Sequence, residues 1–225
     1  MFYFPDIVNF LDSEGKSPEM QYAAVLNGRL QATNRHIGCY IDVDVFCTDP
    51  EQRKNLEGKL FDRDDLMRLS DPYVTNIIFN TDTFEIITDA ESPKENLSRP
   101  YAGIVDTKSL KISIYDAYFE EYIEKTLKFP DLASVIYAVG SDGQPDIKKV
   151  QFRNTHFRGV NLAPSMLMSI ANSFEQKDPN YLRLEFFHAQ PAKDKVERPS
   201  AAILVSPLKS KYSLYKEMAV IMPVF

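Results

Sequence analysis

Three histidines, His36, His156 and His188, are the side chains best suited to acid–base chemistry near neutral pH. A general base needs a nucleophile or an acid partner within hydrogen-bond reach, and chain order alone does not supply one. One hypothesis is therefore an enzyme that acts on a small molecule with a histidine base, on an α+β fold of its own. The simpler interpretation is that each histidine is hydrogen-bonded within the fold or a groove.

An acidic cluster, Asp62, Asp64 and Asp65, could bind Mg²⁺, because this ion prefers carboxylate oxygens. The same residues stand at the start of a predicted helix, where the helix dipole favours negative charge. The helix explanation accounts for the cluster without a metal. We therefore expect no magnesium site here.

The chain contains none of the short motifs that carry a known catalytic or cofactor-binding mechanism. It has no G-x-G-x-x-G, no Walker loop, no G-x-S-x-G and no H-E-x-x-H. This favours a protein that is not an enzyme and that uses no cofactor.

Two cysteines, Cys39 and Cys47, flank the strand-like segment CYIDVDVFC. Their even separation predicts one face of a strand, and along a strand they are too far apart to bond. They are predicted to be free thiols in a reducing compartment. Two cysteines and three separated histidines give no zinc-site spacing, so no metal is predicted.

The composition of the 225-residue chain predicts a folded protein, with 44% hydrophobic and 26% charged residues. This length suffices for two domains of about 100 to 120 residues each. No apolar run approaches a membrane span, and the start MFYFPDIVNF lacks a basic leader region, which predicts a cytoplasmic protein without a membrane partner. The net charge of −6 argues against a generally positive surface, although a local basic face could still contact DNA.

Short strands separated by turns dominate the first half of the sequence. YAAVLNGRLQAT predicts a hairpin, because Asn27-Gly28 favours the positive φ angles of a tight turn. RHIGCYIDVDVF alternates apolar and polar residues, which predicts a strand with one buried and one solvated face. Asp62 is placed to cap a short helix, and two strands are predicted around the turn at 80–83.

The second half begins with DAESPKENLSRP, which is typical of an exposed loop and suggests a boundary between domains 1–103 and 104–225. KISIYDAYFEEYIEKTLKF is predicted to start as a strand and become an amphipathic helix. Pro164 suits the first turn of a further helix, and YLRLEFFHA, AAILVSP and MAVIMPVF are predicted strands. The order helix, strand, strand, strand therefore recurs, and the fold class is α+β.

Several segments, in order, resemble the bacterial DNA sliding clamp, the beta subunit of the replicative polymerase. LNGRLQATNRHIG is similar to a clamp segment with a Thr-Asp-Gly-His-Arg-Leu turn, of which Thr33 and His36 match. GKLFDRDDLMRL, NIIFNTDTFEI, VNLAPSMLMSIANSF, YLRLEFF and AAILVSP resemble the helices and strands that follow. FPDLASVI resembles a linker between clamp domains, and AVIMPVF resembles the terminal Val-Met-Pro-Met-Arg-Leu strand.

The resemblance implies a shorter, two-domain clamp of antiparallel sheets with helices on one face. In such a fold the sheets form the wall of a ring and the helices line a hole for double-stranded DNA. The DNA-facing residues would then be Lys59, Arg63 and Arg68 on one helix and Lys125 and Lys128 on another. The alternative is that these are solvated helix faces, and Glu120, Glu121 and Glu124 oppose phosphate binding on the second helix.

The resemblance also implies a hydrophobic groove for short peptides of polymerases and clamp loaders. The matching positions are Thr33, His36, Val220, Met222 and Pro223. The alternative is that the terminal segment is only an internal strand of a sheet, and the two interpretations are compatible.

Two-domain subunits close a six-domain ring as a trimer, so the resemblance implies a homo-oligomer in which the trimer is favoured. The leading hypothesis is a processivity factor that tethers a polymerase or another factor to DNA. The rival hypotheses are a clamp-fold protein-interaction module without DNA encirclement and the histidine enzyme described above.

Overall fold

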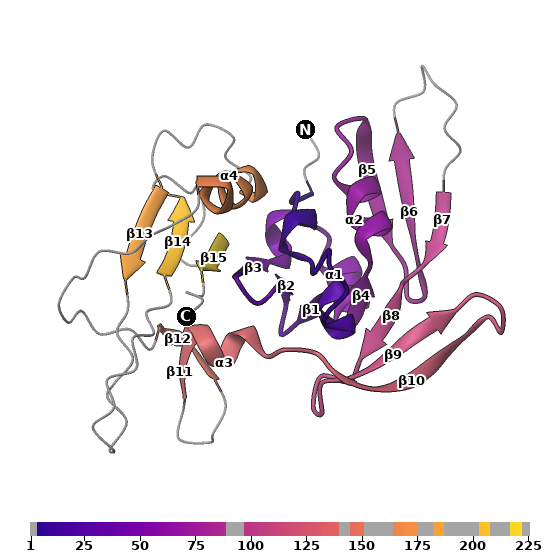
Figure 1. The fold of residues 1–225 in the computed structure, drawn as a ribbon. Coiled ribbons are helices and arrows are strands. Elements are labelled where there is room, and N and C mark those ends of the chain that lie inside the picture. Colours follow the sequence, from indigo (N-terminus) through magenta and orange to yellow (C-terminus); the bar gives the residue numbers. More distant parts are fainter. Residues whose placement is uncertain are drawn as a thin grey trace.

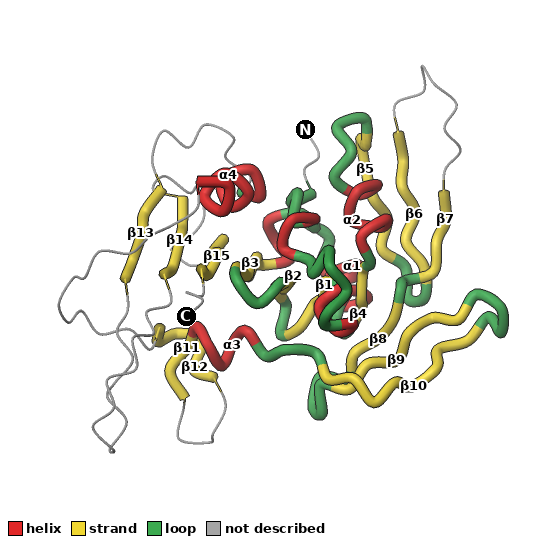
Figure 2. The backbone as a smooth tube through the Cα atoms, in the orientation of Figure 1, coloured by secondary structure: helices red, strands yellow, loops and turns green. Residues whose placement is uncertain are grey.

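A computed structural model gives the fold. It describes residues 4–88, 97–139, 145–150, 164–174, 182–186, 203–207 and 217–221. The described chain is a mixed α+β protein in which antiparallel sheets are extensive and helices are few (Figures 1 and 2). The predicted α+β class is confirmed.

The helices of the described chain are short. The α-helices are α1 Pro50–Leu56, α2 Arg63–Leu69, α3 Leu132–Ile136 and α4 Pro164–Ser173, and the 3-10 helices are η1 Val8–Phe10, η2 Pro18–Gln21 and η3 Val43–Val45. Within the part of the chain that the structure describes, no helix has the length and apolar character needed to cross a membrane.

Within the described residues, the strands form three antiparallel sheets. The largest has ten strands in the order β10-β9-β8-β4-β1-β2-β3-β15-β14-β13. The others are β5-β6-β7 and β11-β12. The strands are β1 Ala23–Leu26, β2 Arg29–Thr33, β3 Ile37–Asp42, β4 Lys59–Phe61, β5 Val74–Phe79, β6 Thr83–Thr88, β7 Leu97–Pro100, β8 Gly103–Val105, β9 Lys111–Asp116, β10 Glu121–Lys128, β11 Tyr137–Val139, β12 Pro145–Val150, β13 Leu182–Phe186, β14 Ile203–Pro207 and β15 Glu217–Ile221.

The predicted hairpin at Asn27-Gly28 is confirmed as the β1–β2 turn. Both residues have positive φ angles, 54° and 71°, as a two-residue hairpin turn requires. Glu57 holds this turn from the side, since its Oε1 and Oε2 accept hydrogen bonds from the Asn27 and Gly28 amides at 2.7 and 2.9 Å. The turn sets Leu26 opposite Arg29 and thereby fixes the register of the two strands.

Strand β3 differs from its prediction in two ways. It ends at Asp42, and the chain continues as η3, so Cys47 lies outside the strand. Both of its faces are also buried from Ile37 to Ile41, so the predicted solvated face is wrong. The face of β3 that was predicted to be solvated is covered by other parts of the fold. The residue pattern of one strand cannot reveal such packing.

Asp62 caps the start of helix α2, as predicted. The Asp62 side chain accepts the Asp65 amide at 2.8 Å, and the Asp65 side chain accepts the Asp62 amide in return. This reciprocal capping satisfies two amides that a helix start leaves unpaired. The strand pair after α2 is also confirmed as β5 and β6, around Asn80–Thr83.

The helix predicted beyond residue 116 is wrong. Residues 111–116 and 121–128 form β9 and β10, which pair antiparallel and project from the body as a hairpin (Figure 1). The spacing of Tyr115, Phe119 and Tyr122 suggested one helical face. In the hairpin, Tyr115 and Tyr122 instead pair across the strands, with ring centroids 5.3 Å apart.

The larger hydrophobic core covers one face of the central strands. Helices α1, α2 and α4 contribute Leu56, Leu66, Leu69 and Ile170 to it, Phe174 follows directly after α4, and β5 and β6 contribute Phe79 and Phe84. A smaller core on the other face contains Leu26, Leu60 and Phe129. Helix α3 also lies on this second face, because Leu132 at its start approaches Gly38 there. The prediction that all helices share one face is therefore wrong.

The predicted domain boundary falls at the first residues of β8. This strand pairs with β4 on one side and β9 on the other, so the ten-stranded sheet contains strands from both proposed domains. The segment 89–100, predicted as a loop, contains β7 at its end, and residues 89–96 lie outside the described chain. The division into 1–103 and 104–225 stays a prediction.

Candidate peptide groove

The pairing of β3 with β15 brings three of the predicted groove residues close together. Val220 on β15 lies opposite Gly38 on β3, and Gly38 lies opposite Thr33 on β2. Three of the predicted residues are thus neighbours, because His36 belongs to the turn between β2 and β3. Met222 and Pro223 lie outside the described residues, as do His156 and His188.

The turn that carries His36 is held by its own side chains. Thr33 Oγ1 donates a hydrogen bond to the Ile37 carbonyl at 2.9 Å. Asn34 Oδ1 accepts the amides of His36 and Ile37 at 3.1 and 3.0 Å. These bonds fix the backbone of His36, while its side chain remains exposed.

The N-terminal segment buttresses the same turn. Asn34 Nδ2 donates to the Asn9 carbonyl at 3.1 Å, and the Arg35 guanidinium donates to the Ser17 hydroxyl. Arg35 has a φ of 75°, a left-handed conformation that costs energy for a residue with a side chain. The contacts with Asn9 and Ser17 therefore hold a turn that would not be the local preference of its sequence.

Helix α3 packs closely against β3 at Gly38. A Cβ atom on Gly38 would lie 3.4 Å from Leu132 Cδ1 and 3.4 Å from the Ala32 carbonyl oxygen. Thr33 and Val220 are buried, each with 2% exposure. Thr33 and Val220 are thus covered within the fold, and His36 is the exposed member of the three described residues.

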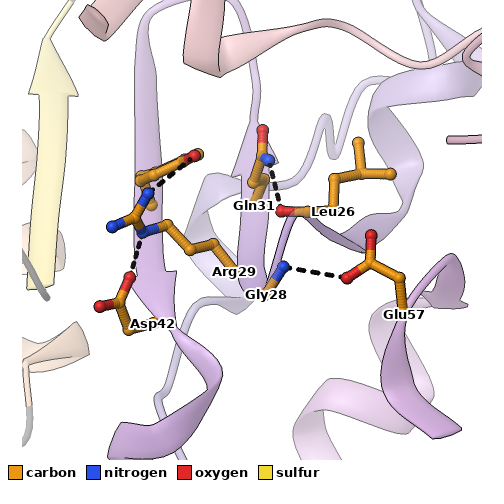
Figure 3. A network of polar contacts seen from close by, with 7 residues as sticks. Leu26, Gly28, Arg29, Gln31, Asp42 and Glu57 are labelled. Atoms are coloured by element: carbon orange, nitrogen blue, oxygen red, sulfur yellow. Dashed lines mark hydrogen bonds and ion pairs between the residues drawn. The ribbon is translucent and has the colours of Figure 1, made fainter. Parts of the chain in front are cut away.

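Figure 3 shows a polar network on β2 and β3. By the strand register it lies on the same face of the sheet as Thr33. Arg29 pairs with Asp42 across β2 and β3, and Arg29 Nη1 donates to the Tyr40 hydroxyl at 3.2 Å. The guanidinium also lies 4.7 Å from the centre of the Tyr40 ring. Burial raises the pKa of Tyr40, and the hydrogen bond from Arg29 opposes that rise. Tyr40 therefore donates or accepts as a neutral hydroxyl.

Gln31 lies in the same network and is 1% exposed. Its Nε2 donates to the Leu26 carbonyl at 3.3 Å (Figure 3), while its Oε1 accepts no hydrogen bond within the described chain. A buried amide oxygen without a donor is costly. Gln31 Oε1 is the one buried polar atom of this network that has no hydrogen-bond donor among the described residues.

Lys59 does not lie on a helix, contrary to its prediction as a DNA-facing residue. It is a residue of β4 with 8% exposure, and its Nζ lies 5.0 Å from the centre of the Tyr101 ring. A side chain with this exposure offers little surface to a phosphate backbone. Arg63 and Arg68, in contrast, are exposed on α2.

Lys125 and Lys128 are exposed, but on β10 and not on a helix. Glu121 and Glu124 share this strand and are exposed as well, and Glu124 pairs with Lys111 at 3.1 Å. The predicted DNA-facing set is therefore divided between a helix, a central strand and an edge hairpin.

The acidic cluster at the start of α2 serves the helix. Asp65 is 1% exposed and its Oδ1 accepts from Arg99 Nε at 3.1 Å, which links α2 to β7. Burial raises the pKa of Asp65 to about 6, the Asp62 charge adds to the rise, and Arg99 opposes it. Among the residues described, no group of three or more histidine, cysteine, aspartate or glutamate side chains is placed to hold a metal ion.

Both cysteines are free, as predicted, and both are buried. Burial raises the pKa of Cys39 to about 12, and burial also raises the pKa of Cys47. A thiol with a raised pKa is a poor nucleophile at neutral pH. The cysteines are therefore packing residues.

Comparisons of the chain with protein families, with curated proteins and with solved structures found no match. The geometry described above and the resemblance of the sequence segments are thus the basis for a functional proposal.

The sequence did not predict that Leu132 approaches Gly38 or that Arg29 forms an ion pair with Asp42. A signal for the pair existed, because the Asn27-Gly28 turn and the turn at Thr33–Gly38 together set the register that places Arg29 opposite Asp42. No local signal places Leu132 beside Gly38, since that contact joins distant parts of the chain.

Proposed function

We propose that this protein is a sliding-clamp-like processivity factor that tethers a partner to DNA. The observation that carries the proposal is the pairing of β3 with β15, which sets the Thr33–His36 turn beside Val220. This is the juxtaposition that the resemblance implies for a groove that receives polymerase or clamp-loader peptides. A turn that is already fixed by its own hydrogen bonds reduces the conformational cost of binding a peptide beside His36.

The ends of the large sheet support assembly of several copies. Strands β10 and β13 are the first and last in the described order, so each has one strand neighbour within the described chain. A heterologous contact between β10 of one copy and β13 of the next would continue the sheet, and such contacts close into a ring when the rotation between copies permits. The resemblance favours a ring of three copies.

Substituting His36 with alanine is expected to weaken peptide binding by about tenfold or more, as for a residue that anchors an interface. His36 is exposed, so the fold should not change. The measurement is fluorescence anisotropy of a labelled peptide from the clamp-binding segment of a replicative polymerase, titrated with wild-type protein and the variant.

Lys54→Ala on α1 is the control for this titration, because Lys54 is exposed and pairs only with Glu51 in the described chain. It should bind the peptide as the wild type does. Absence of wild-type binding, or equal loss in both variants, would contradict the groove.

A second candidate is a clamp-fold interaction module that does not encircle DNA. It is favoured by burial of Lys59 and by the exposed Glu121 and Glu124 beside Lys125 and Lys128, which weaken the DNA-facing surface. The two candidates share the peptide groove and differ in whether DNA is retained.

The processivity factor predicts a mass in light scattering near three times the 25.8 kDa chain, and retention on circular but not linearised DNA once loaded. Arg63→Glu combined with Arg68→Glu should weaken DNA retention several-fold without changing the mass, because these side chains are exposed on α2. Lys54→Glu combined with Lys108→Glu is the matched charge reversal outside the predicted DNA-facing set, because both side chains are exposed, and it should leave DNA retention unchanged. A stable monomer, or DNA retention unaffected by the α2 variant, would favour the interaction module.

A further inference from the structure

The β9–β10 hairpin ends in two exposed aromatic side chains. They belong to the hairpin tip, residues 116–121, which projects from the body of the molecule (Figure 1). Tyr118 is 86% exposed and Phe119 is 61% exposed, and their rings contact each other edge to face with centroids 4.8 Å apart. Single exposed apolar residues are ordinary on a protein surface, but a packed pair at the end of a projecting hairpin forms a contiguous apolar patch.

Backbone hydrogen bonds hold the two rings in place. Asp116 Oδ1 accepts the Tyr118 amide at 2.9 Å and the Phe119 amide at 3.4 Å. Glu120 has a φ of 54°, a left-handed conformation that is unfavourable for a residue with a side chain. The loop thus has a defined shape, and an interface that uses it loses little conformational freedom on binding.

The charge around the two rings is of one sign. Residues 112–124 contain no lysine, arginine or histidine, and their acidic residues are Asp116, Glu120, Glu121 and Glu124. Glu124 pairs with Lys111 at 3.1 Å, whereas the other three form no ion pair within the described chain. The hairpin tip is therefore an aromatic patch with an acidic border.

Two of these acidic residues face each other. Asp116 and Glu121 are directly opposite where β9 ends and β10 begins. Like charges in opposed cross-strand positions destabilise a hairpin. The folding of the hairpin does not favour this arrangement, and a cationic group from outside would relieve the repulsion. This pair indicates a positively charged partner.

We propose that the hairpin tip is a docking surface for a second protein that presents an apolar pocket bordered by lysine or arginine side chains. The rings of Tyr118 and Phe119 fill the pocket. The basic side chains pair with the carboxylates and lie over the ring faces, which carry negative charge density. A phosphate backbone or an anionic lipid surface would instead be repelled by the tip.

This inference does not depend on the proposed peptide groove or on a ring of three copies. The loop residues 117–120 lie outside β9 and β10, and the groove is built from β2, β3 and β15. Failure of peptide binding at His36 would leave the hairpin tip unaffected.

Peptides from a random library displayed on phage are the probe for this surface. The native full-length protein is the target, and phage that also bind the variant Tyr118→Ser combined with Phe119→Ser are removed first. The selected peptides are expected to combine large apolar residues with lysine or arginine. In fluorescence anisotropy, synthetic versions should bind the wild type at least about tenfold more tightly than the double variant, because its interface anchors are removed.

Two variants separate the hairpin tip from general stickiness. Tyr73→Ser is the matched control, because Tyr73 is 71% exposed elsewhere, after helix α2, and it should bind the peptides as the wild type does. Glu120→Gln combined with Glu121→Gln keeps the rings and removes two charges, so it should weaken binding several-fold at low salt and reduce the salt dependence. Absence of tip-dependent peptides, selected peptides without basic residues, or unchanged affinity in the Glu120–Glu121 variant would overturn the proposal.

Other occupants of the hairpin tip are tested with the Tyr118–Phe119 double variant. Its mass in light scattering should equal that of the wild type, and a smaller mass would identify a second copy of this chain as the occupant. Its sedimentation with phosphatidylcholine vesicles should also match that of the wild type, and tip-dependent sedimentation would identify a lipid surface. Either of these two results would overturn the proposal.

Discussion

Replacing Phe61 with alanine is expected to lower the free energy of unfolding by about 3–5 kcal/mol. Phe61 lies on β4, is fully buried, and contacts aromatic rings on three sides. The ring centroids of Phe4, Phe84 and Tyr101 lie 6.4, 5.8 and 5.6 Å away. Alanine would remove these contacts and leave a cavity in the larger core, between the ten-stranded sheet and the sheet that contains Phe84.

Urea unfolding followed by circular dichroism measures this change. Phe119→Ala is the matched control, because Phe119 is 61% exposed at the tip of the β9–β10 hairpin and should cost less than about 1 kcal/mol. Equal destabilisation by the two substitutions would show that Phe61 is not at the centre of the core.

Asp65 should make the protein less stable as the pH rises from 4 to 6. Its pKa is about 6 in the folded chain and about 4 when unfolded. Below pH 4 it is protonated in both states, and between the two values only the folded state keeps the proton, so the contribution of Asp65 to stability falls with rising pH. Two pKa units correspond to about 3 kcal/mol, and above pH 6 the effect is constant.

Asp65→Asn removes this titration, so the variant should gain about 3 kcal/mol relative to the wild type between pH 4 and 7. The difference is measured by urea unfolding across this range, which cancels the other titrating groups. The Arg99 ion pair forms only when Asp65 is ionised, so its effect is already contained in the folded-state pKa and adds no separate contribution to this difference. Asp64→Asn, at an exposed position on the same helix, is the control substitution. A difference for Asp65→Asn that does not change with pH would mean that Arg99 keeps this carboxylate ionised.

Local chemistry explains which elements were predictable from sequence. The Asn27-Gly28 turn and the Asp62 cap depend on residues within three positions of each other, and both are confirmed. Helix α4 was likewise predictable, because Pro164 fits a first turn and Ile170 and Phe174 fall on one buried face.

The remaining features depend on contacts between distant segments. Tyr115, Phe119 and Tyr122 fit a helical period as well as a hairpin, and only the pairing of β9 with β8 decides between them. Lys59 looked like a surface residue because nothing beside it in sequence reveals that β1 and β8 enclose it. For the candidate groove, the resemblance brought Thr33, His36 and Val220 into one prediction. The approach of Leu132 to Gly38 could be found only in the structure.

The position of β15 beside β3 also has a consequence for synthesis of the chain. Strand β3 emerges early from the ribosome, while the strand that covers its free edge is Glu217–Ile221. Until that strand emerges, the nascent chain presents an unpaired edge lined by Ile37 and Ile41, which can pair with other chains. Because so distant a pairing also forms slowly, we expect truncated products that lack β15 to aggregate and to depend on chaperones.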